Sequence, residues 1–133
     1  MNSLKVAVAQ LPNNTDVTSN QALAVEAIQR LEPHRPDLII FPECYLTGFS
    51  ALVKDTDFDL VASGLKAIQN IVEVRDVRVF LPSVIKHGEK FYNAVYYLQP
   101  GCEPTIFYKE GLTDSETLFF TAGTASSRFI HIN

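Results

Sequence analysis

The segment Asp37-Leu38-Ile39-Ile40-Phe41-Pro42-Glu43 contains the apolar run that decides the fold of this chain. The four apolar residues from Leu38 to Phe41 predict a strand buried on both faces, as strands of parallel sheets are. Pro33 and Pro36 come just before this run and end a preceding helix. An earlier Val-rich segment, residues 5–10, predicts a first and central strand. Strand, helix and strand in this order indicate a parallel crossover unit.

Segments on either side of these residues supply the remaining elements. Thr18 followed by Gln21 resembles a capping box, and it starts the helix that we predict from about Ser19 to Glu32. Apolar residues at helical spacing predict a second helix over 57–74. Further strands are predicted over 77–85 and 91–98, joined by a five-residue hairpin loop at 86–90, and then over 105–108 and 128–133. The fold class is therefore α/β, or α+β, with a mixed parallel and antiparallel sheet.

Length and composition exclude several classes of protein. A chain of 133 residues with 47% apolar and 20% charged residues is expected to fold as one domain. The net charge of −4 comes from scattered acidic residues, so no basic face is available for nucleic acid. The longest apolar run near a strand is far shorter than the roughly 20 residues of a membrane span. The first residues show no signal peptide, and we therefore expect a cytoplasmic protein without membrane contact. Neither the cysteines nor the histidines have the spacing of a metal site.

Two charged residues directly after predicted strands are the first candidates for catalysis. Glu43 follows the buried strand, where open α/β sheets place their sites, and a carboxylate held at such an apolar rim suits a general base. Lys109 follows the strand at 105–108, and beside a buried glutamate it could stabilise a developing oxyanion. Each residue also has an ordinary alternative: Glu43 could cap a helix or form an ion pair, and Lys109 could be a solvated side chain.

Five short motifs, in order along the chain, make it resemble a known family. They are Lys5-Val6-Ala7-Val8-Ala9-Gln10; Asp37 to Glu43 with Leu46-Thr47-Gly48; Tyr92-Asn93-Ala94; Tyr108-Lys109 with Leu112; and Phe119-Phe120-Thr121-Ala122-Gly123. Together they run from Lys5 to Gly123, and they resemble the N-terminal half of the carbon-nitrogen hydrolase (nitrilase) superfamily. One of these motifs alone would be a weak signal, whereas five in the family's order are specific.

The resemblance implies a fold, a reaction and roles for three residues. Members are amidases, nitrilases, carbamoylases and related enzymes with an α-β-β-α four-layer sandwich, of which this chain would form half or more. They use no metal or organic cofactor. A glutamate, a lysine and a cysteine together hydrolyse a C–N bond of a small amide or nitrile substrate through a covalent intermediate. By position in the motifs, Glu43 is the expected base and Lys109 the expected oxyanion partner. Many members have a second glutamate in the loop after the lysine, and Glu116 in Asp114-Ser115-Glu116 is the expected match.

The resemblance also predicts what this chain lacks. In the family the nucleophilic cysteine follows the next strand, so residues 1–133 are expected to be a single domain that is truncated before that cysteine and inactive alone. Cys44 is expected to be a buried structural thiol, because successive side chains at an extended strand end point to opposite sides. Cys102 is expected on a surface turn.

Half of a two-sheet sandwich would expose an apolar sheet face, and we therefore expect a homo-oligomer or association with a C-terminal half. Two other functions stay open. The chain could be a non-catalytic interaction or scaffolding module that keeps the same fold. A dinucleotide-binding or phosphate-binding role ranks third, since the glycines form neither GxGxxG nor a P-loop.

Overall fold

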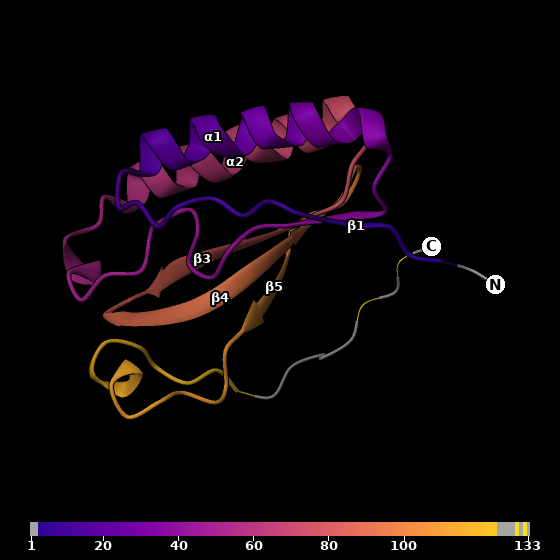
Figure 1. The fold of residues 1–133 in the computed structure, drawn as a ribbon. Helices are drawn as coiled ribbons and strands as arrows, with labels where there is room; N and C mark the ends of the chain where they lie inside the picture. The colour runs from indigo at the N-terminus through magenta and orange to yellow at the C-terminus, as the bar shows by residue number, and fades with distance from the viewer. Residues whose placement is uncertain (1–2, 125–129, 131, 133) are drawn as a thin grey trace.

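The chain folds into a five-stranded mixed sheet with two helices on one face (Figure 1). The computed structural model describes residues 3–124, 130 and 132. The elements, in chain order, are β1 (Val6–Val8), α1 (Val17–Leu31), η1 (Glu32–His34), β2 (Leu38–Ile40), η2 (Val53–Asp55), α2 (Phe58–Arg75), β3 (Val79–His87), β4 (Lys90–Leu98), β5 (Thr105–Tyr108) and η3 (Glu116–Leu118), where η marks a short 3-10 helix. The predicted fold class is confirmed. The strand predicted over 128–133 falls mainly on residues outside the described ones.

The strands lie in the sheet in chain order, β1-β2-β3-β4-β5. β1, β2 and β3 are parallel to one another, whereas β3, β4 and β5 alternate in direction. The prediction of a central first strand is wrong for this sheet: among the described residues β1 lies at the edge, and Val8 is 69% exposed. The reason is topological, because the chain enters the sheet at β1 and adds every later described strand on the same side.

Aspartates begin both helices. α1 starts two residues earlier than predicted, because Asp16 rather than Thr18 is its N-cap. The Asp16 carboxylate accepts hydrogen bonds from the Thr18 N–H (3.2 Å) and from the Ser19 hydroxyl (2.7 Å), and the latter contact lowers the pKa of Asp16. Asp57 caps α2 in the same way, accepting from two N–H groups of the first turn. Each carboxylate therefore satisfies donors that have no partner inside the helix.

The hairpin between β3 and β4 is tighter than the sequence predicts. Its ladder extends to the pair His87 and Lys90, so the loop is Gly88-Glu89 rather than the five residues 86–90. Gly88 adopts φ +57°, a left-handed conformation that glycine reaches without steric cost. Because the turn is so short, β3 and β4 are paired over nine residues each, and they form the longest ladder of the sheet.

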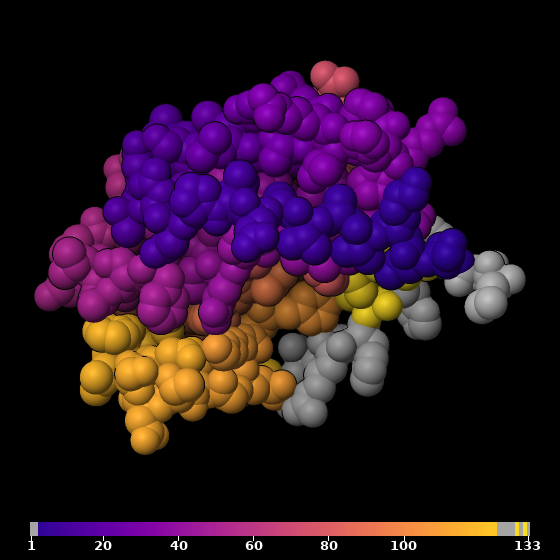
Figure 2. Space-filling view, viewed as in Figure 1, coloured from indigo at the N-terminus to yellow at the C-terminus, as the bar shows by residue number. Residues whose placement is uncertain are grey.

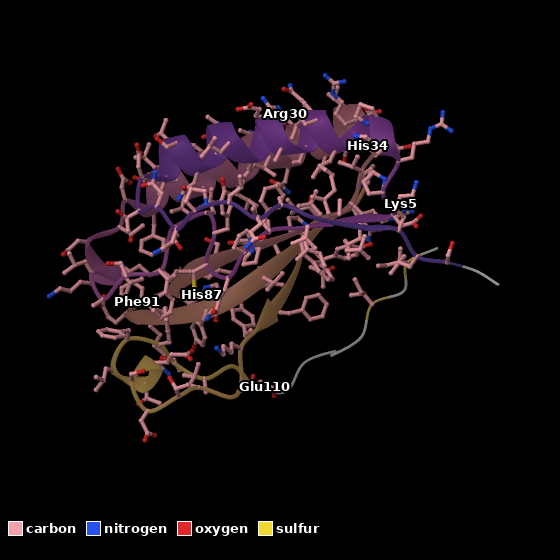
Figure 3. All side chains as sticks on the ribbon, viewed as in Figure 1. Lys5, Arg30, His34, His87, Phe91 and Glu110 are labelled. Atoms are coloured by element: carbon pink, nitrogen blue, oxygen red, sulfur yellow. The ribbon has the colours of Figure 1, made fainter. Side chains whose placement is uncertain are left out.

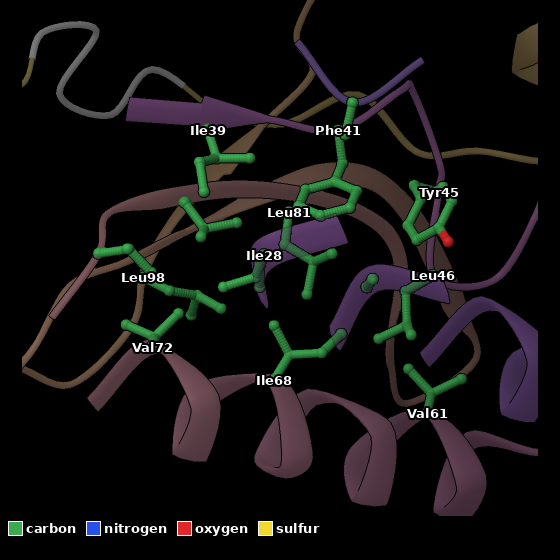
Figure 4. Close-up of a cluster of buried hydrophobic side chains, with 14 of the residues drawn as sticks. Ile28, Ile39, Phe41, Tyr45, Leu46, Val61, Ile68, Val72, Leu81 and Leu98 are labelled. Atoms are coloured by element: carbon green, nitrogen blue, oxygen red, sulfur yellow. The ribbon is translucent and has the colours of Figure 1, made fainter. Parts of the chain in front are cut away.

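The main core lies between the helices and the sheet (Figure 4). Ile28 of α1 and Ile68 of α2 are fully buried there, and they face Leu81 and Leu98 of the sheet. Complete burial of a side chain of this size stabilises a fold by roughly 1.5–3 kcal/mol. This core fixes both helices to one face. Within the described part of the chain, neither helix is long and apolar enough to cross a membrane.

Side chains that alternate with this core along the strands point to the other face of the sheet. Pro82 of β3 and Val95 of β4 pair on that face, and Phe107 of β5 continues the row. A smaller buried cluster consists of Cys44, Val53, Val84 and Phe120. Figure 2 shows that the orange and yellow segment after β5 lies on the side away from the helices. One helix layer and one sheet layer make half of the predicted four-layer sandwich.

Two glycines with positive φ provide a matched test of how closely Gly48 packs against the backbone of Asn14. Gly48 has φ +74°, and a Cβ there would collide with the backbone carbonyl of Asn14. Gly101 has φ +73°, but a Cβ there would meet nothing within 4 Å. We expect Gly101→Ala to lower the free energy of unfolding by ~1–2 kcal/mol, from left-handed strain alone. Gly48→Ala should lower it by ~3 kcal/mol or more, because the backbone blocks the added methyl group. Urea denaturation measures both; equal losses would contradict this account.

Candidate active site

Glu43 lies just after β2, on a segment that continues along β3. The Phe41 N–H donates to the Phe80 carbonyl and the Leu46 N–H donates to the Pro82 carbonyl, each at 3.1 Å. Between these two contacts the chain turns. The turn brings the Glu43 carboxylate to β4, where the Asn93 side-chain amide donates a hydrogen bond to its Oε1 atom at 2.7 Å.

Lys109 approaches Glu43 from the end of β5, the strand on the far side of β4. Its N–H donates to the carbonyl of Asn93 at 2.8 Å, which extends the β4–β5 ladder by one residue beyond Tyr108. The Lys109 Nζ atom lies 3.1 Å from Glu43 Oε1, although the two residues are 66 positions apart in the sequence. In Figure 3, Glu110 marks this segment below the sheet, on the side away from Arg30. The predicted convergence of Glu43 and Lys109 is therefore present.

Glu116 completes a cluster of three charges. It begins η3, and the Lys109 Nζ atom lies 3.2 Å from its Oε1 atom and 3.1 Å from its Oε2 atom. The Thr113 hydroxyl donates to Glu116 Oε1 at 3.2 Å and accepts from the Glu116 N–H at 3.3 Å. All three residues that the sequence singles out thus meet at one point, with Lys109 between the two carboxylates.

The two carboxylates differ in exposure. The Glu43 side chain is 58% exposed, whereas that of Glu116 is 10% exposed. The expectation of a buried Glu43 is therefore wrong, because Glu43 reaches outward from a turn whereas Glu116 is enclosed by η3 and by Lys109. The buried carboxylate of the site is Glu116.

A mutual hydrogen bond keeps Lys109 and Glu116 ionised. The contact with Glu116, and after it the contact with Glu43, raises the pKa of Lys109 above its ordinary value. In turn the hydrogen bond from Lys109, helped by that from Thr113, lowers the pKa of Glu116. Both shifts favour the charged forms. At neutral pH the site therefore holds a lysine ammonium group against the Glu116 carboxylate.

A cavity of about 390 Å³ adjoins the cluster on the sheet face that lies away from the helices. Its lining residues are Glu43, Pro82, Asn93, Ala94, Val95, Phe107, Tyr108 and Lys109. Apolar walls with a few polar groups at one end are typical of sites for small molecules. Among the described residues, no group of three or more His, Cys, Asp and Glu side chains could hold a metal ion.

The two cysteines lie where they were predicted, one of them for a different reason. Cys44 is fully buried, and burial, with the neighbouring Glu43 charge, raises its pKa to about 12. It does not continue an extended strand, since its φ of +53° places it in a left-handed turn. A thiol with such a pKa is almost entirely protonated at neutral pH. Cys102 is exposed on the turn after β4.

Two residues that touch the carboxylates were missed by reasoning from the sequence alone. Asn93 was recognised only as part of a motif, and Thr113 was not singled out. A polar residue in the middle of an otherwise apolar and aromatic strand was the available signal for Asn93. No comparable pattern marks Thr113, because its contacts depend on how the loop after β5 folds back.

Comparison with known proteins places this chain in a family. Residues 5–121 match the carbon-nitrogen hydrolase family. A glutamine-dependent NAD(+) synthetase from Acinetobacter baylyi is 29% identical over 92% of the chain, and an (R)-stereoselective amidase from Pseudomonas sp. is 29% identical over 90%. The chain spans only 24% and 44% of these two relatives.

A solved structure shares the fold. It is a mutant amidase from Nesterenkonia sp. AN1 that carries the acetamide moiety of fluoroacetamide at its active site cysteine. The structural match has a TM-score of 0.80 at 16% identity, over 92% of this chain and 49% of the amidase. Residues 5–121, which match the family, contain every motif residue up to Thr121 and all three charged residues of the cluster. This chain therefore belongs to the carbon-nitrogen hydrolase family.

Proposed function

We propose that the protein hydrolyses a C–N bond of a small amide or nitrile, with Glu43 and Lys109 in its catalytic site. The observation that carries the proposal is the 3.1 Å contact between Lys109 Nζ and Glu43 Oε1 at the rim of the 390 Å³ cavity. A base and a fixed cation then face the same space. A reacting carbon in that space would be within reach of both.

In this proposal a cysteine from outside the 133 residues is the nucleophile. Glu43 takes the thiol proton, and the thiolate attacks the substrate carbon. The Lys109 ammonium group stabilises the negative charge that develops on the oxygen or nitrogen of the substrate. With an amide, Glu43 returns the proton to the leaving ammonia or amine, and it then activates the water that hydrolyses the thioester. With a nitrile, the proton goes to the substrate nitrogen and gives a thioimidate. A first water, activated by Glu43, then releases ammonia and leaves the thioester, which a second water hydrolyses.

The properties of the two cysteines in the chain support an external nucleophile. Cys44 is buried and has a pKa of about 12, so it offers almost no thiolate at neutral pH. Cys102 lies beyond the end of β4, next to Gly101, whose N–H donates to Glu73 of α2. Glu43 contacts β4 at Asn93 instead, so Cys102 is not beside the proposed base. The Nesterenkonia amidase that shares the fold carries the acetamide moiety of fluoroacetamide on its active site cysteine.

The environments of the two glutamates support different roles for them. Glu43 lines the cavity and is 58% exposed, so it can meet a substrate or a water molecule. Glu116 is held by both Lys109 and Thr113, and its pKa is lowered. A carboxylate whose pKa is lowered is a poor proton carrier near neutral pH. We therefore assign proton transfer to Glu43 and the holding of Lys109 to Glu116.

The relatives suggest two substrates to test first. One is named for its dependence on glutamine and the other for its amidase activity. Both names fit a carboxamide, in which ammonia or an amine leaves. A panel of glutamine, small aliphatic amides and small nitriles, tested on the full-length protein that carries this sequence, separates these possibilities through the ammonia that each releases.

Replacement of the proposed base provides the main test. In the full-length protein, Glu43→Gln should lower kcat by about 10²–10⁴-fold, because a side-chain amide cannot accept the thiol proton. The matched control is Glu26→Gln, which neutralises a glutamate of α1 that pairs with Arg30 at 2.8 Å. Ammonia release under steady-state conditions measures kcat for both variants. Undiminished turnover by Glu43→Gln would refute the proposed role.

The electrostatic role of Glu116 has a separate test. The Glu116 contact is the largest cause of the raised pKa of Lys109, so Glu116→Gln should move that pKa downward. A titration of the Lys109 side chain by NMR measures the shift, and the alkaline limb of the rate profile should move to lower pH with it. Glu26→Gln serves again as the control. If the pKa of Lys109 stays where it is, Glu116 does not hold the lysine.

Residues 1–133 alone should not turn over any substrate of the panel, because the proposed nucleophile lies outside them. We also propose that this segment associates with a second copy or with a C-terminal half. Support comes from Phe80, Val95 and Phe107, which are only half-buried on the sheet face away from the helices. Sedimentation and binding of a hydrophobic dye test the association. A monodisperse monomer that binds no dye would speak against it.

A further inference from the structure

We propose that Asn93 is a positioning residue that holds the Glu43 carboxylate against Lys109. The inference rests on the proposed function, because it explains how the base of that reaction keeps its place. The side chain of Asn93 contacts Glu43 and its backbone contacts Lys109, so one residue of β4 ties together the two charges of the site.

The two contacts of Asn93 are short and made from a rigid place. Its amide Nδ2 atom donates to Glu43 Oε1 at 2.7 Å, and its carbonyl accepts from the Lys109 N–H at 2.8 Å. The residue is 4% exposed and pairs with Val84 in the β3–β4 ladder. Because β4 lies between β3 and β5, hydrogen bonds on both sides fix its position (Figure 1). Asn93 can therefore act as a fixed point of reference.

Glu43 needs such a fixed point more than the other members of the cluster do. Its side chain is 58% exposed, whereas those of Lys109 and Glu116 are 35% and 10% exposed. An exposed glutamate loses considerable rotamer freedom when it is held in one geometry. Lys109 alone would hold it by a single contact of 3.1 Å, at a distance where solvent competes. The buried amide of Asn93 adds a second and shorter contact to the same oxygen.

The contacts also indicate which oxygen of Glu43 carries the proton. Both Asn93 and Lys109 reach Oε1, and within the described residues no hydrogen bond reaches Oε2. The bound oxygen has its lone pairs engaged by two donors, which leaves Oε2 to accept the thiol proton. Asn93 thus orients the carboxylate as well as anchoring it.

An amide is the side chain that this position requires. It donates a hydrogen bond without adding a charge beside Lys109. An aspartate would place a third carboxylate in the cluster, and a leucine would offer no donor to Oε1. Asn93→Leu therefore removes the donor while keeping the branching at Cγ, and Asn93→Ser removes the contact by shortening the side chain.

The experiment measures turnover by variants of the full-length protein. Asn93→Leu should lower kcat by about 100-fold with KM changed less than about threefold, because the base is displaced while the cavity remains. Asn93→Ser should show the same pattern, and it serves if the leucine variant does not fold. The matched controls are Asn20→Leu and Asn20→Ser. Asn20 is another buried asparagine, whose amide donates to the carbonyls of Asn14 and Leu46 and, among the described residues, has no hydrogen bond to Glu43, Lys109 or Glu116.

A double-mutant cycle separates positioning from a general loss of structure. If Asn93 acts through Glu43, its replacement in a Glu43→Gln background should cause little further loss of kcat. The same loss in both backgrounds would overturn the inference, since Asn93 would then act independently of the base. A loss of kcat in the Asn20 variants as large as in the Asn93 variants would overturn it as well.

A readout that needs no activity keeps this inference distinct from the proposed function. When Asn93 is replaced, Glu43 should leave Lys109, and the pKa of Lys109 should fall part of the way, because Glu116 remains in contact. The NMR titration of Lys109 measures this fall. An unchanged titration in the Asn93 variants would overturn the inference. Full turnover by Glu43→Gln would refute the proposed function, and the titration would then decide whether Asn93 holds the pair.

Discussion

The ammonium group of Lys109, held between the carboxylates of Glu43 and Glu116, is the interaction on which the site depends. It brings together side chains from three segments: the turn after β2, the end of β5 and the short helix η3. Without the positive charge the two carboxylates would repel each other across a short distance. The contact between Lys109 and Glu116 also raises the pKa of the lysine and lowers that of the glutamate, so the arrangement and the ionisation state of these two residues support one another.

The sheet keeps this cluster separate from the core that stabilises the fold. Leu81 and Leu98 face the helices, while Pro82 and Val95 point to the cavity from the same two strands. The alternation of side chains along a strand is enough to produce this division. One face can therefore be packed tightly for stability, and the other can leave a cavity beside the charged groups. β4 takes part in both functions through neighbouring residues.

Sequence patterns predicted which segments form helices and strands better than they predicted where those segments lie and how buried their residues are. The apolar run at 38–41 and the helical spacing in 57–74 identified β2 and α2. The motifs singled out Glu43 and Lys109, and the loop after Lys109 singled out Glu116. Long-range geometry decided the rest. The edge position of β1, the exposure of Glu43 and the burial of Glu116 depend on which segments come together, and no local pattern records this. The contact between Asn93 and Glu43, 50 positions apart, is of the same kind.

The environments of the two glutamates are unequal, so the two carboxylates of the cluster are not equivalent. Glu116 lies against Lys109 and Thr113 with little freedom, so it behaves as part of the protein's fixed electrostatic field. Glu43 faces the cavity and accepts hydrogen bonds on one oxygen only among the described residues, which leaves its other oxygen for the proton transfer that we propose. A symmetric pair would share the lysine equally, and neither carboxylate would be assigned to proton transfer. In the proposed reaction, burial rather than residue type would therefore separate the glutamate that transfers the proton from the glutamate that holds the cation.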